Sequence, residues 1–444
     1  MKIKLYRSAT VGIDFKGFKI LQDPWLADGA YYGSWFHYPS FDLSANIDEI
    51  NSYDAIYISH IHPDHCDDQT MKMIDKKIPI YIHKFHAKFL KAKLERFGFK
   101  VFEIDNGKRT EITQGIFINI LAADNCNPEL CYKFLGCADP NIKGESQQID
   151  TLCIIDDNKN TLMNVNDCPV DLAKSTFSKI KKDYQKIDVM LVGYQNASPY
   201  PQCFNNLNIN EKKTVGKKVA QNCLNKALTY INSIQPKYFL PFAGTYVLGG
   251  KLSPLNDTRG VPNIDQAYEY LEQNQKVSMA IKINPGSSFD YISETASQNY
   301  EKFNSIKYQS FLKKISKVKM DYEKDPVPSF EEIFSLAEGA YKKFLEKKLI
   351  NNVSLTTDII IDVDQKLIKV PHNKNELEII EVNKFENGNK YVKYKTDIRL
   401  LKRLLLGPRY AHWNNAEIGS HISFFRNPDV FDRNVYQSMC YFHN

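Results

Sequence analysis

The chain has 444 residues, of which 43% are hydrophobic and 25% are charged, as in ordinary globular proteins. Its formal net charge of +6 is spread along the chain, so we expect neither a nucleic-acid-binding surface nor a membrane-binding surface. The chain has no run of about 18 apolar residues, and its first residues lack the apolar block of a signal peptide. Nine cysteines follow no paired spacing, which predicts reduced thiols and a cytoplasmic location.

The first elements in chain order are paired strands over residues 3–22, with a turn near Asp14–Gly17. Asp23 ends this pattern, because the residue before a proline avoids the helical conformation. A second apolar run, Ile56–Ser59, predicts a buried strand, and Pro63 stops its regular continuation. We therefore expect a loop at the carboxyl end of this strand, a common place for functional side chains.

That loop carries three histidines and an aspartate within six positions: His60, His62, Asp64 and His65. Imidazole suits zinc, iron and manganese, and a carboxylate adds a hard oxygen ligand. By their spacing, the first two histidines can bind one metal ion, while Asp64 and His65 turn toward a second ion. The alternative is a polar loop with chance histidines, but only ten histidines occur in the whole chain. The pattern therefore predicts a metal site.

Alternating helix and strand patterns follow this loop and lead to another candidate ligand, Asp124. Asp124 stands at the end of an apolar strand, as the histidine loop does. A cysteine-bearing insertion comes next, and its cysteine spacings match no zinc ribbon, which predicts free thiols. The elements predicted here are a helix that Asp67 or Asp68 caps and that ends at Lys76, a helix over 85–97, and strands at 78–83, 99–104 and 116–123.

A predicted hairpin over residues 151–167 delivers the last candidate ligand, Asp167. This aspartate ends an apolar strand and lies close to Pro169, a placement like that of the first ligands. Its carboxylate could bridge two metal ions. The alternative is an N-cap for a helix that begins near Pro169. Taken with the histidine loop, the placement favours a ligand.

The first region continues to alternate strands and helices and has hairpins at both ends. This pattern suggests two sheets faced by helices. It suits an α/β fold of the αββα sandwich type, whose site lies at the strand ends. The remaining elements predicted here are strands at 187–194, 236–241 and 277–283, and helices at 210–234 and 264–274.

Five stretches resemble, in order, the metallo-β-lactamase-fold part of the CMP-N-acetylneuraminate hydroxylase family and its bacterial relatives. The histidine loop has the H-x-H-x-D-H form of the whole superfamily, whereas 23–25 and 241–244 are narrower features. The resemblance implies a metallo-β-lactamase-fold catalytic domain over residues 1–290, with metal ligands His60, His62, Asp64, His65, Asp124 and Asp167. The five stretches are Ile20–Trp25, Tyr57–His65, Leu162–Pro169, Asn196–Phe204 and Pro236–Gly244.

Two departures from that family bear on the chemistry. The hydroxylases carry a Rieske iron–sulfur domain, which needs a C-x-H and a C-x-x-H arrangement. This chain has only Cys440–His443 and no C-x-H, so we expect electrons for an oxygenation to come from another protein. Hydrolases of this fold usually place further histidines where this chain has Asp124 and the histidine-free stretch 241–244. Oxygen ligands in place of imidazole shift the preference from zinc toward iron or manganese.

After residue 286 the composition changes, and we predict an α+β accessory domain over residues 291–444 that could bind substrate. The segment His412–His421 is both polar and aromatic, and it could form a substrate-reading loop over the metal site. The alternative is a helix-to-strand connection with a satisfied histidine. The predicted elements are helical stretches over 295–350, broken at 326–328 and restarted by a capping box at 329–332, strands at 358–363, 366–370, 378–382 and 391–395, and a helix at 397–406.

The favoured hypothesis is an iron-dependent oxygenase or hydroxylase acting on a sugar nucleotide or a related polar metabolite, with an external electron donor. The resemblance and the carboxylate-rich ligand set motivate it. The alternative is a hydrolase of a phosphoester, lactone or amide, in which a metal lowers the pKa of bound water from about 16 toward about 7 and Asp64 or Asp167 orients the hydroxide. A non-catalytic binding protein is a third hypothesis, which the intact ligand set argues against.

The expected cofactors and partners follow from these hypotheses. We expect two divalent metal ions, with iron favoured and zinc or manganese as alternatives. The expected partner is a small-molecule substrate, which could be anionic, and neither nucleic acid nor a membrane is expected.

Overall fold

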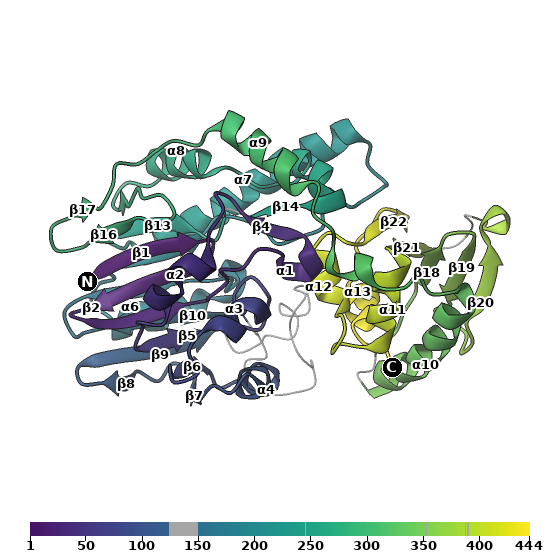
Figure 1. Ribbon diagram of the computed structural model, residues 1–444, viewed down its shortest axis with the longest axis horizontal. Coiled ribbons are helices and arrows are strands. Elements are labelled where there is room, and N and C mark those ends of the chain that lie inside the picture. The colour runs from purple at the N-terminus through teal and green to yellow at the C-terminus, as the bar shows by residue number, and fades with distance from the viewer. Residues whose placement is uncertain (124–149, 245, 351–352, 387, 389) are drawn as a thin grey trace.

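The polypeptide folds into two lobes of unequal size, with the N-terminus in the larger lobe and the C-terminus in the smaller one (Figure 1). The structure is a computed structural model that describes residues 1–123, 150–244, 246–350, 353–386, 388 and 390–444. The larger lobe contains two large β-sheets, and the smaller lobe contains a five-stranded sheet. Within these ranges, no helix combines the length and the apolar character needed to cross a membrane.

The first sheet has eight strands and begins with the hairpins predicted for residues 3–22. Its strands in spatial order are β17 (Thr295–Ala296), β16 (Ser288–Asp290), β1 (Lys2–Arg7), β2 (Thr10–Phe15), β3 (Phe18–Gln22), β5 (Ala55–Tyr57), β6 (Ile80–His83) and β7 (Val101–Ile104). Gly17 turns the chain between β2 and β3 with a φ of 98°, a left-handed conformation that glycine adopts without steric cost. Strands β3, β5, β6 and β7 run parallel, so their carboxyl ends share one edge.

The second sheet has seven strands, antiparallel from β8 to β11 and parallel from β11 to β15. Their spatial order is β15 (Met279–Ala280), β13 (Tyr238–Phe242), β12 (Val189–Gly193), β11 (Thr161–Asn164), β10 (Thr151–Asp156), β9 (Ile116–Ala122) and β8 (Thr110–Thr113). Thr151 pairs with Ala122, and Cys153 pairs with Asn164. The start of β10 therefore lies at the same edge as the ends of β9 and β11.

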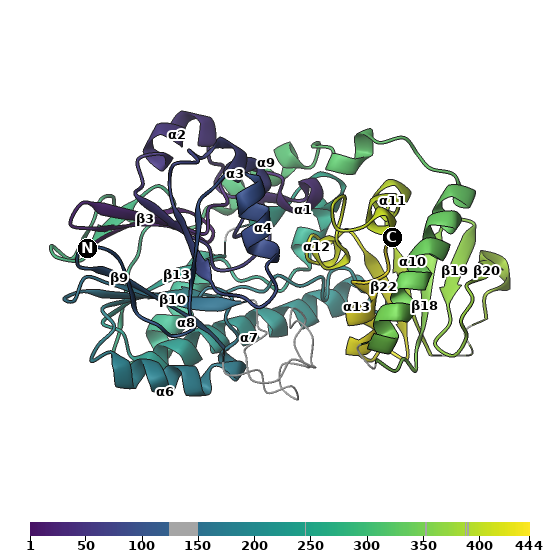
Figure 2. The ribbon, with the colours of Figure 1, turned by 90° about the horizontal axis from the view of Figure 1, so that it is seen from below.

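The two sheets pack face to face, with helices on both outer faces (Figure 2). Between the sheets, aliphatic side chains such as Val11 and Ile20 pack with Ile118 and Leu162 in one buried cluster. Helices α2 (Leu43–Ile50), α3 (Asp68–Met73) and α4 (Phe89–Arg96) cover the first sheet, and α6 (Lys174–Asp183), α7 (Ile209–Ile234) and α8 (Ile264–Asn274) cover the second. This arrangement is the predicted αββα sandwich, and it is confirmed.

The smaller lobe has the predicted α+β character. Its sheet has the order β20 (Glu378–Glu381), β19 (Lys366–Val370), β18 (Asp358–Val363), β21 (Tyr391–Lys395) and β22 (Ser423–Asn427). Helices α10 (Phe330–Ile350), α11 (Ile398–Leu406), α12 (Trp413–Ile418) and α13 (Arg433–Met439) pack on it around a core that includes Trp413 and Phe424. Phe204 of the larger lobe joins this core, so the two lobes share buried surface.

Short elements connect the lobes and cross the predicted boundary at residue 290. Strands β16 and β17 lie on either side of this position and belong to the first sheet. Helix α9 (Ser305–Ile315) packs on Phe36 and Val247 of the larger lobe. The sandwich therefore extends past residue 290, and the independence of two units with that boundary stays a prediction. The other short elements are α1 (Ala30–Gly33), β4 (Trp35–His37), β14 (Tyr246–Leu248) and 3-10 turns at 170–172, 250–257, 321–324 and 382–384.

None of the described cysteines is in a disulfide, and five of them are buried. They are Cys66, Cys153, Cys168, Cys203, Cys223 and Cys440. The three cysteines of the insertion after Asp124 lie outside the described residues. The cytoplasmic location that these thiols suggested stays a prediction.

Candidate metal centre

The histidine loop lies where the sequence predicts it, between the end of β5 and the start of α3. It carries His60, His62, Asp64 and His65, and all but His62 are less than one tenth exposed. Asp67 caps α3 by accepting hydrogen bonds from the backbone and the hydroxyl of Thr70, which fixes the far end of the loop.

Asp167 follows β11 and reaches the histidine loop from the second sheet. Its Oδ2 lies 3.7 Å from His60 Nε2 and 3.4 Å from His65 Nε2. The 3-10 turn that follows has Pro169 at its N-cap and no side-chain cap bond, so the helix-cap role left open by the sequence does not hold. A single carboxylate oxygen thus lies between two imidazoles, a placement that suits a bridging ligand.

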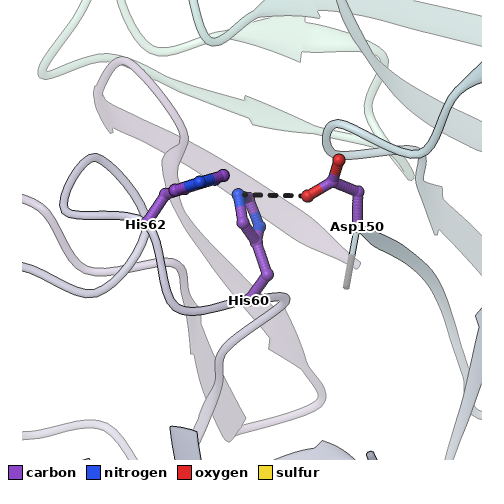
Figure 3. A group of neighbouring side chains, drawn as sticks. All are labelled: His60, His62 and Asp150. Atoms are coloured by element: carbon purple, nitrogen blue, oxygen red, sulfur yellow. Dashed lines mark ion pairs between the residues drawn. The ribbon is translucent and has the colours of Figure 1, made fainter. Parts of the chain in front are cut away.

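Asp150 belongs to the same cluster, although the sequence pattern did not single it out. Its Oδ1 lies 3.6 Å from His60 Nε2, and Figure 3 shows it facing His60 and His62 from the start of β10. The ligand atoms of these three residues all lie within 4.8 Å of one another. One signal could have found it: β10 is antiparallel to β9, so the residue before β10 lies beside the end of β9.

Asp124, the predicted ligand after β9, lies outside the described residues. Because Thr151 pairs with Ala122, the chain enters and leaves the insertion at the same sheet edge. Asp150 stands where the chain leaves the insertion, directly before β10. A metal-binding role for Asp124 therefore stays a prediction, and Asp150 is an additional candidate from the same edge.

Asp64 lies beside His65 and is held by a tyrosine of the short element α1. Its Oδ2 is 3.6 Å from His65 Nε2, and the Tyr31 hydroxyl donates a hydrogen bond of 2.5 Å to its Oδ1. Tyr31 has a φ of 53°, a left-handed conformation that costs a non-glycine residue conformational energy. Such strain persists only where the surroundings enforce it, which indicates that the position of this hydroxyl is fixed by neighbouring contacts.

Asp23, the residue that follows β3, orients the last histidine of the loop. Its side chain is fully buried, and Oδ2 lies 2.8 Å from His65 Nδ1. The backbone N–H and the hydroxyl of Ser59 also donate to this carboxylate. When the Asp23 carboxylate accepts a hydrogen bond from Nδ1–H of His65, the Nε2 atom is left as the ligand atom. Carboxylate–histidine–metal arrangements work in this way.

The electrostatics of the cluster favour a bound cation. Burial lowers the pKa of His60 well below the usual histidine value, and it also lowers the pKa of His62. Burial opposes a charge on His65, but Asp167 and the other nearby carboxylates raise its pKa well above the usual value. Burial and then the charge of Asp167 raise the pKa of Asp150 well above its usual range. Several carboxylates therefore face a single imidazolium, and a metal ion would relieve their repulsion.

Two buried atoms at the centre of the cluster test whether the donor set fits a metal. In the part of the chain that the structure describes, neither His60 Nε2 nor Asp150 Oδ1 has a hydrogen-bond partner. Their separation of 3.6 Å is too long for a direct hydrogen bond. An unsatisfied buried polar group costs roughly 1–3 kcal/mol, and a metal ion bound by both atoms would remove that cost. Imidazole nitrogens and carboxylate oxygens together fit a divalent transition metal.

A cavity of about 720 Å³ opens over the cluster and lies between the two lobes. This volume is in the range of small-molecule sites. Asp64, His65, Asp150 and Asp167 line its floor, and the aromatic rings of Tyr31, Trp35, Tyr200, Phe204 and Tyr246 line its sides. The smaller lobe contributes Asn414, Glu417, Ile418, Arg426, Phe431 and Tyr436.

The segment His412–His421 contains α12 and leads to β22, and part of it lines the cavity, so a substrate-reading role stays a prediction. Asn414 and Glu417 line the cavity, as a substrate-reading loop would. His421 is instead a satisfied core residue, because its Nε2 donates to the Tyr31 carbonyl at 2.6 Å and its Nδ1 lies 3.1 Å from the Tyr322 hydroxyl. Asn414 and Glu417 thus face the site, whereas His421 packs between the lobes.

The chain has sequence relatives among iron–sulfur proteins and hydroxylases. It is 27% identical over 291 residues to a Mycolicibacterium smegmatis protein whose name describes a Rieske 2Fe-2S iron–sulfur protein, covering 64% of this chain and 52% of that protein. It is 26% identical over 236 residues to the cytidine monophosphate-N-acetylneuraminic acid hydroxylase of Danio rerio, covering 51% of this chain and 35% of the hydroxylase. The chain thus spans about half the length of the first relative and about a third of the second. These relatives confirm the resemblance predicted from the five stretches.

No protein-family model matches the chain. Igni18, a metallo hydrolase from Ignicoccus hospitalis, is similar in structure with a TM-score of 0.43 and 14% identity, covering 65% of this chain and 98% of Igni18.

Proposed function

We propose that this chain is a metal-dependent hydroxylase that uses two divalent metal ions, with iron favoured, to oxygenate a small polar metabolite such as a sugar nucleotide. The observation that carries the proposal is the composition of the cluster. Among the described residues, two overlapping groups that share His60 each combine two imidazoles with one carboxylate: His60–His62–Asp150 and His60–His65–Asp167. Two histidines and one carboxylate are the ligand set of non-haem iron oxygenases.

The cluster divides naturally into two metal positions that share one bridging carboxylate. His60, His62 and Asp150 would hold the first ion, and Asp64 and His65 would hold the second. Asp167 would bridge them, because its Oδ2 lies within 3.7 Å of a histidine from each group. Asp124 remains a further candidate ligand of either ion.

When bound, the two irons would supply the redox chemistry that activates O2. The protein would contribute orientation: Asp23 holds His65, and Tyr31 holds Asp64. Hydroxylation of a C–H bond consumes one O2, two electrons and two protons, and it releases one water. We propose that the electrons come from a donor outside this sequence, because its cysteines and histidines do not form the C-x-H and C-x-x-H pair of a Rieske centre.

The cavity supports a polar substrate of limited size. Lys226 and Arg426 line it and could attract an anionic group, whereas the aromatic side walls would pack against a ring. Arg426 stacks on Phe204 with its guanidinium 4.5 Å from the ring centre, so part of this wall is fixed in advance. The Danio rerio relative is named as a hydroxylase of cytidine monophosphate-N-acetylneuraminic acid, which is a sugar nucleotide, and we extend that substrate class to this chain as part of the proposal.

Metal analysis of anaerobically purified protein tests this function. We expect about two iron equivalents per chain. We also expect O2 consumption that requires an added electron donor and one of the sugar nucleotides in a panel of such compounds. Full occupancy by zinc without iron-supported turnover would contradict the proposal. Oxygen-independent cleavage of a phosphoester, lactone or amide would assign the chain to the hydrolase alternative instead.

A further inference from the structure

Helix α12 of the smaller lobe contacts the metal cluster directly. Asn414 Oδ1 lies 3.2 Å from His62 Nε2, although the two residues are 352 positions apart in the chain. Asn414 is half-buried on the cavity wall, in the first turn of α12. The contact therefore depends on how the two lobes pack together.

This contact determines which nitrogen of His62 is available to a metal. A side-chain amide oxygen can only accept a hydrogen bond, so His62 must donate from Nε2. A neutral imidazole carries one proton, and the Nδ1 atom then keeps a free lone pair. Asn414 thus selects the tautomer that binds metal through Nδ1.

The same lobe also supports the tyrosine that holds Asp64. The His421 ring donates to the Tyr31 carbonyl at 2.6 Å, and the backbone N–H of His412 donates to the Tyr32 hydroxyl at 2.7 Å. Tyr31 and Tyr32 both have left-handed φ values, 53° and 60°, which need such support. Gly419 permits the approach, because a Cβ atom there would lie 2.9 Å from Tyr31 Cβ.

We propose that Asn414 is a positioning residue for His62, and that the smaller lobe completes the metal centre by docking α12 onto the ligand loop. This inference rests on the metal centre proposed above and adds that metal affinity depends on the second lobe. Partners that orient a metal-binding histidine change metal affinity by about 10- to 100-fold when they are removed.

The test compares three variants of the full chain in a Co(II) titration, followed by the visible absorption bands that report the ligand set. Asn414→Leu removes the acceptor at similar size, Asn414→Asp keeps an oxygen acceptor, and Asn375→Leu makes the same change at an exposed site in the smaller lobe. We expect Asn414→Leu to weaken one metal position by about 10- to 100-fold and to alter its bands. Asn414→Asp should bind like the wild-type chain, as should Asn375→Leu.

Thermal unfolding of the metal-free variants separates positioning from simple structural support. Asn414 is only half-buried, so its replacement should leave the metal-free melting temperature close to that of the Asn375→Leu control. Equal Co(II) affinity in Asn414→Leu and the control would overturn the inference, and so would an equal loss in Asn414→Leu and Asn414→Asp. If Asn414→Leu fails to fold, Asn414→Ala provides the same comparison. A wild-type chain that binds no Co(II) would overturn the metal centre itself.

Discussion

The two walls of the cavity are built in different ways. The metal-binding wall concentrates four candidate ligands within six consecutive residues, and the other candidates stand at strand ends on the same edge of the sandwich. The opposite wall comes from α12, β22 and α13 of the smaller lobe, which reach the cavity only through tertiary packing. The first wall is thus set largely by local sequence, and the second by the docking of two lobes. We expect the first wall to supply the metal ligands and the second to control selectivity, with Asn414 of α12 supporting His62 from the second wall.

Removal of a ligand from the metal-binding wall should give the largest effect. His62→Ala should empty one metal position and abolish turnover, because no other described side chain offers an imidazole at that place. The fold should survive, since the buried strand and helix on either side keep their apolar contacts. Metal analysis and circular dichroism check both expectations, with His86→Ala, an exposed histidine outside the cluster, as the control. Unchanged metal content in His62→Ala would contradict the assignment.

Asp167→Asn should have the next largest effect, because it keeps the shape of the side chain and removes its charge. A bridging carboxylate offsets the repulsion between two dications, so its loss should weaken one ion more than the other. We expect about one metal equivalent in place of two, with a matching loss of turnover. Both metals and full turnover in this variant would leave Asp167 outside the ligand set.

Replacement of a residue that orients a ligand should lower metal affinity less than replacement of the ligand itself. Asp23→Asn weakens the hydrogen bond that orients His65, so we expect metal affinity to fall by about 10- to 100-fold. Asp67→Asn provides a matched control, because Asp67 is also a buried aspartate of this region but caps α3 and does not orient a ligand. Chelator competition distinguishes the two variants, and equal affinity losses would contradict the role given to Asp23.

Much of the sandwich could be predicted because its signals are local. Helix α8 and strands β18 and β19 begin and end where the sequence places them, since capping residues and turns mark their ends. Other elements are shorter than predicted: α4 begins at Phe89 and not at Phe85, and the strand expected over 277–283 has only two paired residues. An edge strand such as β15 pairs on one side only, so its length depends on its neighbour and not on its own apolar pattern.

The parts of the site that sequence reasoning missed are those that depend on long-range contacts. Asp150 precedes a strand and is separated from Ala122 by an insertion, so only the antiparallel pairing of β9 and β10 brings it to the cluster. The contact between Asn414 and His62 depends on the packing of two lobes, which no local pattern encodes. His60, His62, Asp64 and His65 could be predicted because one loop carries them all.

Replacement of Glu417 offers the last test. Glu417 lies on α12, in the wall that the smaller lobe contributes, so its replacement should change stability without changing metal content. Glu417 is 4% exposed, and it lines the cavity. Burial raises its pKa from 4.5 to about 8. We therefore expect Glu417→Gln to keep the metal stoichiometry of the wild-type chain, and a loss of metal would show that Glu417 takes part in metal binding.

The raised pKa of Glu417 also predicts how the stability difference between Glu417→Gln and the wild-type chain changes with pH. Between pH 4.5 and about 8, folded Glu417 binds a proton that the unfolded chain releases, so the wild-type chain loses stability as pH rises through this window. Gln cannot ionise, and Glu417→Gln should therefore become more stable than the wild-type chain by about 1–4 kcal/mol near pH 9, with little difference near pH 4. Melting temperatures of the two metal-free proteins between pH 4 and pH 9 measure this divergence. Because every other titrating group is common to both proteins, parallel curves would show that the Glu417 carboxyl is solvated when folded, and that the cavity wall around it admits water.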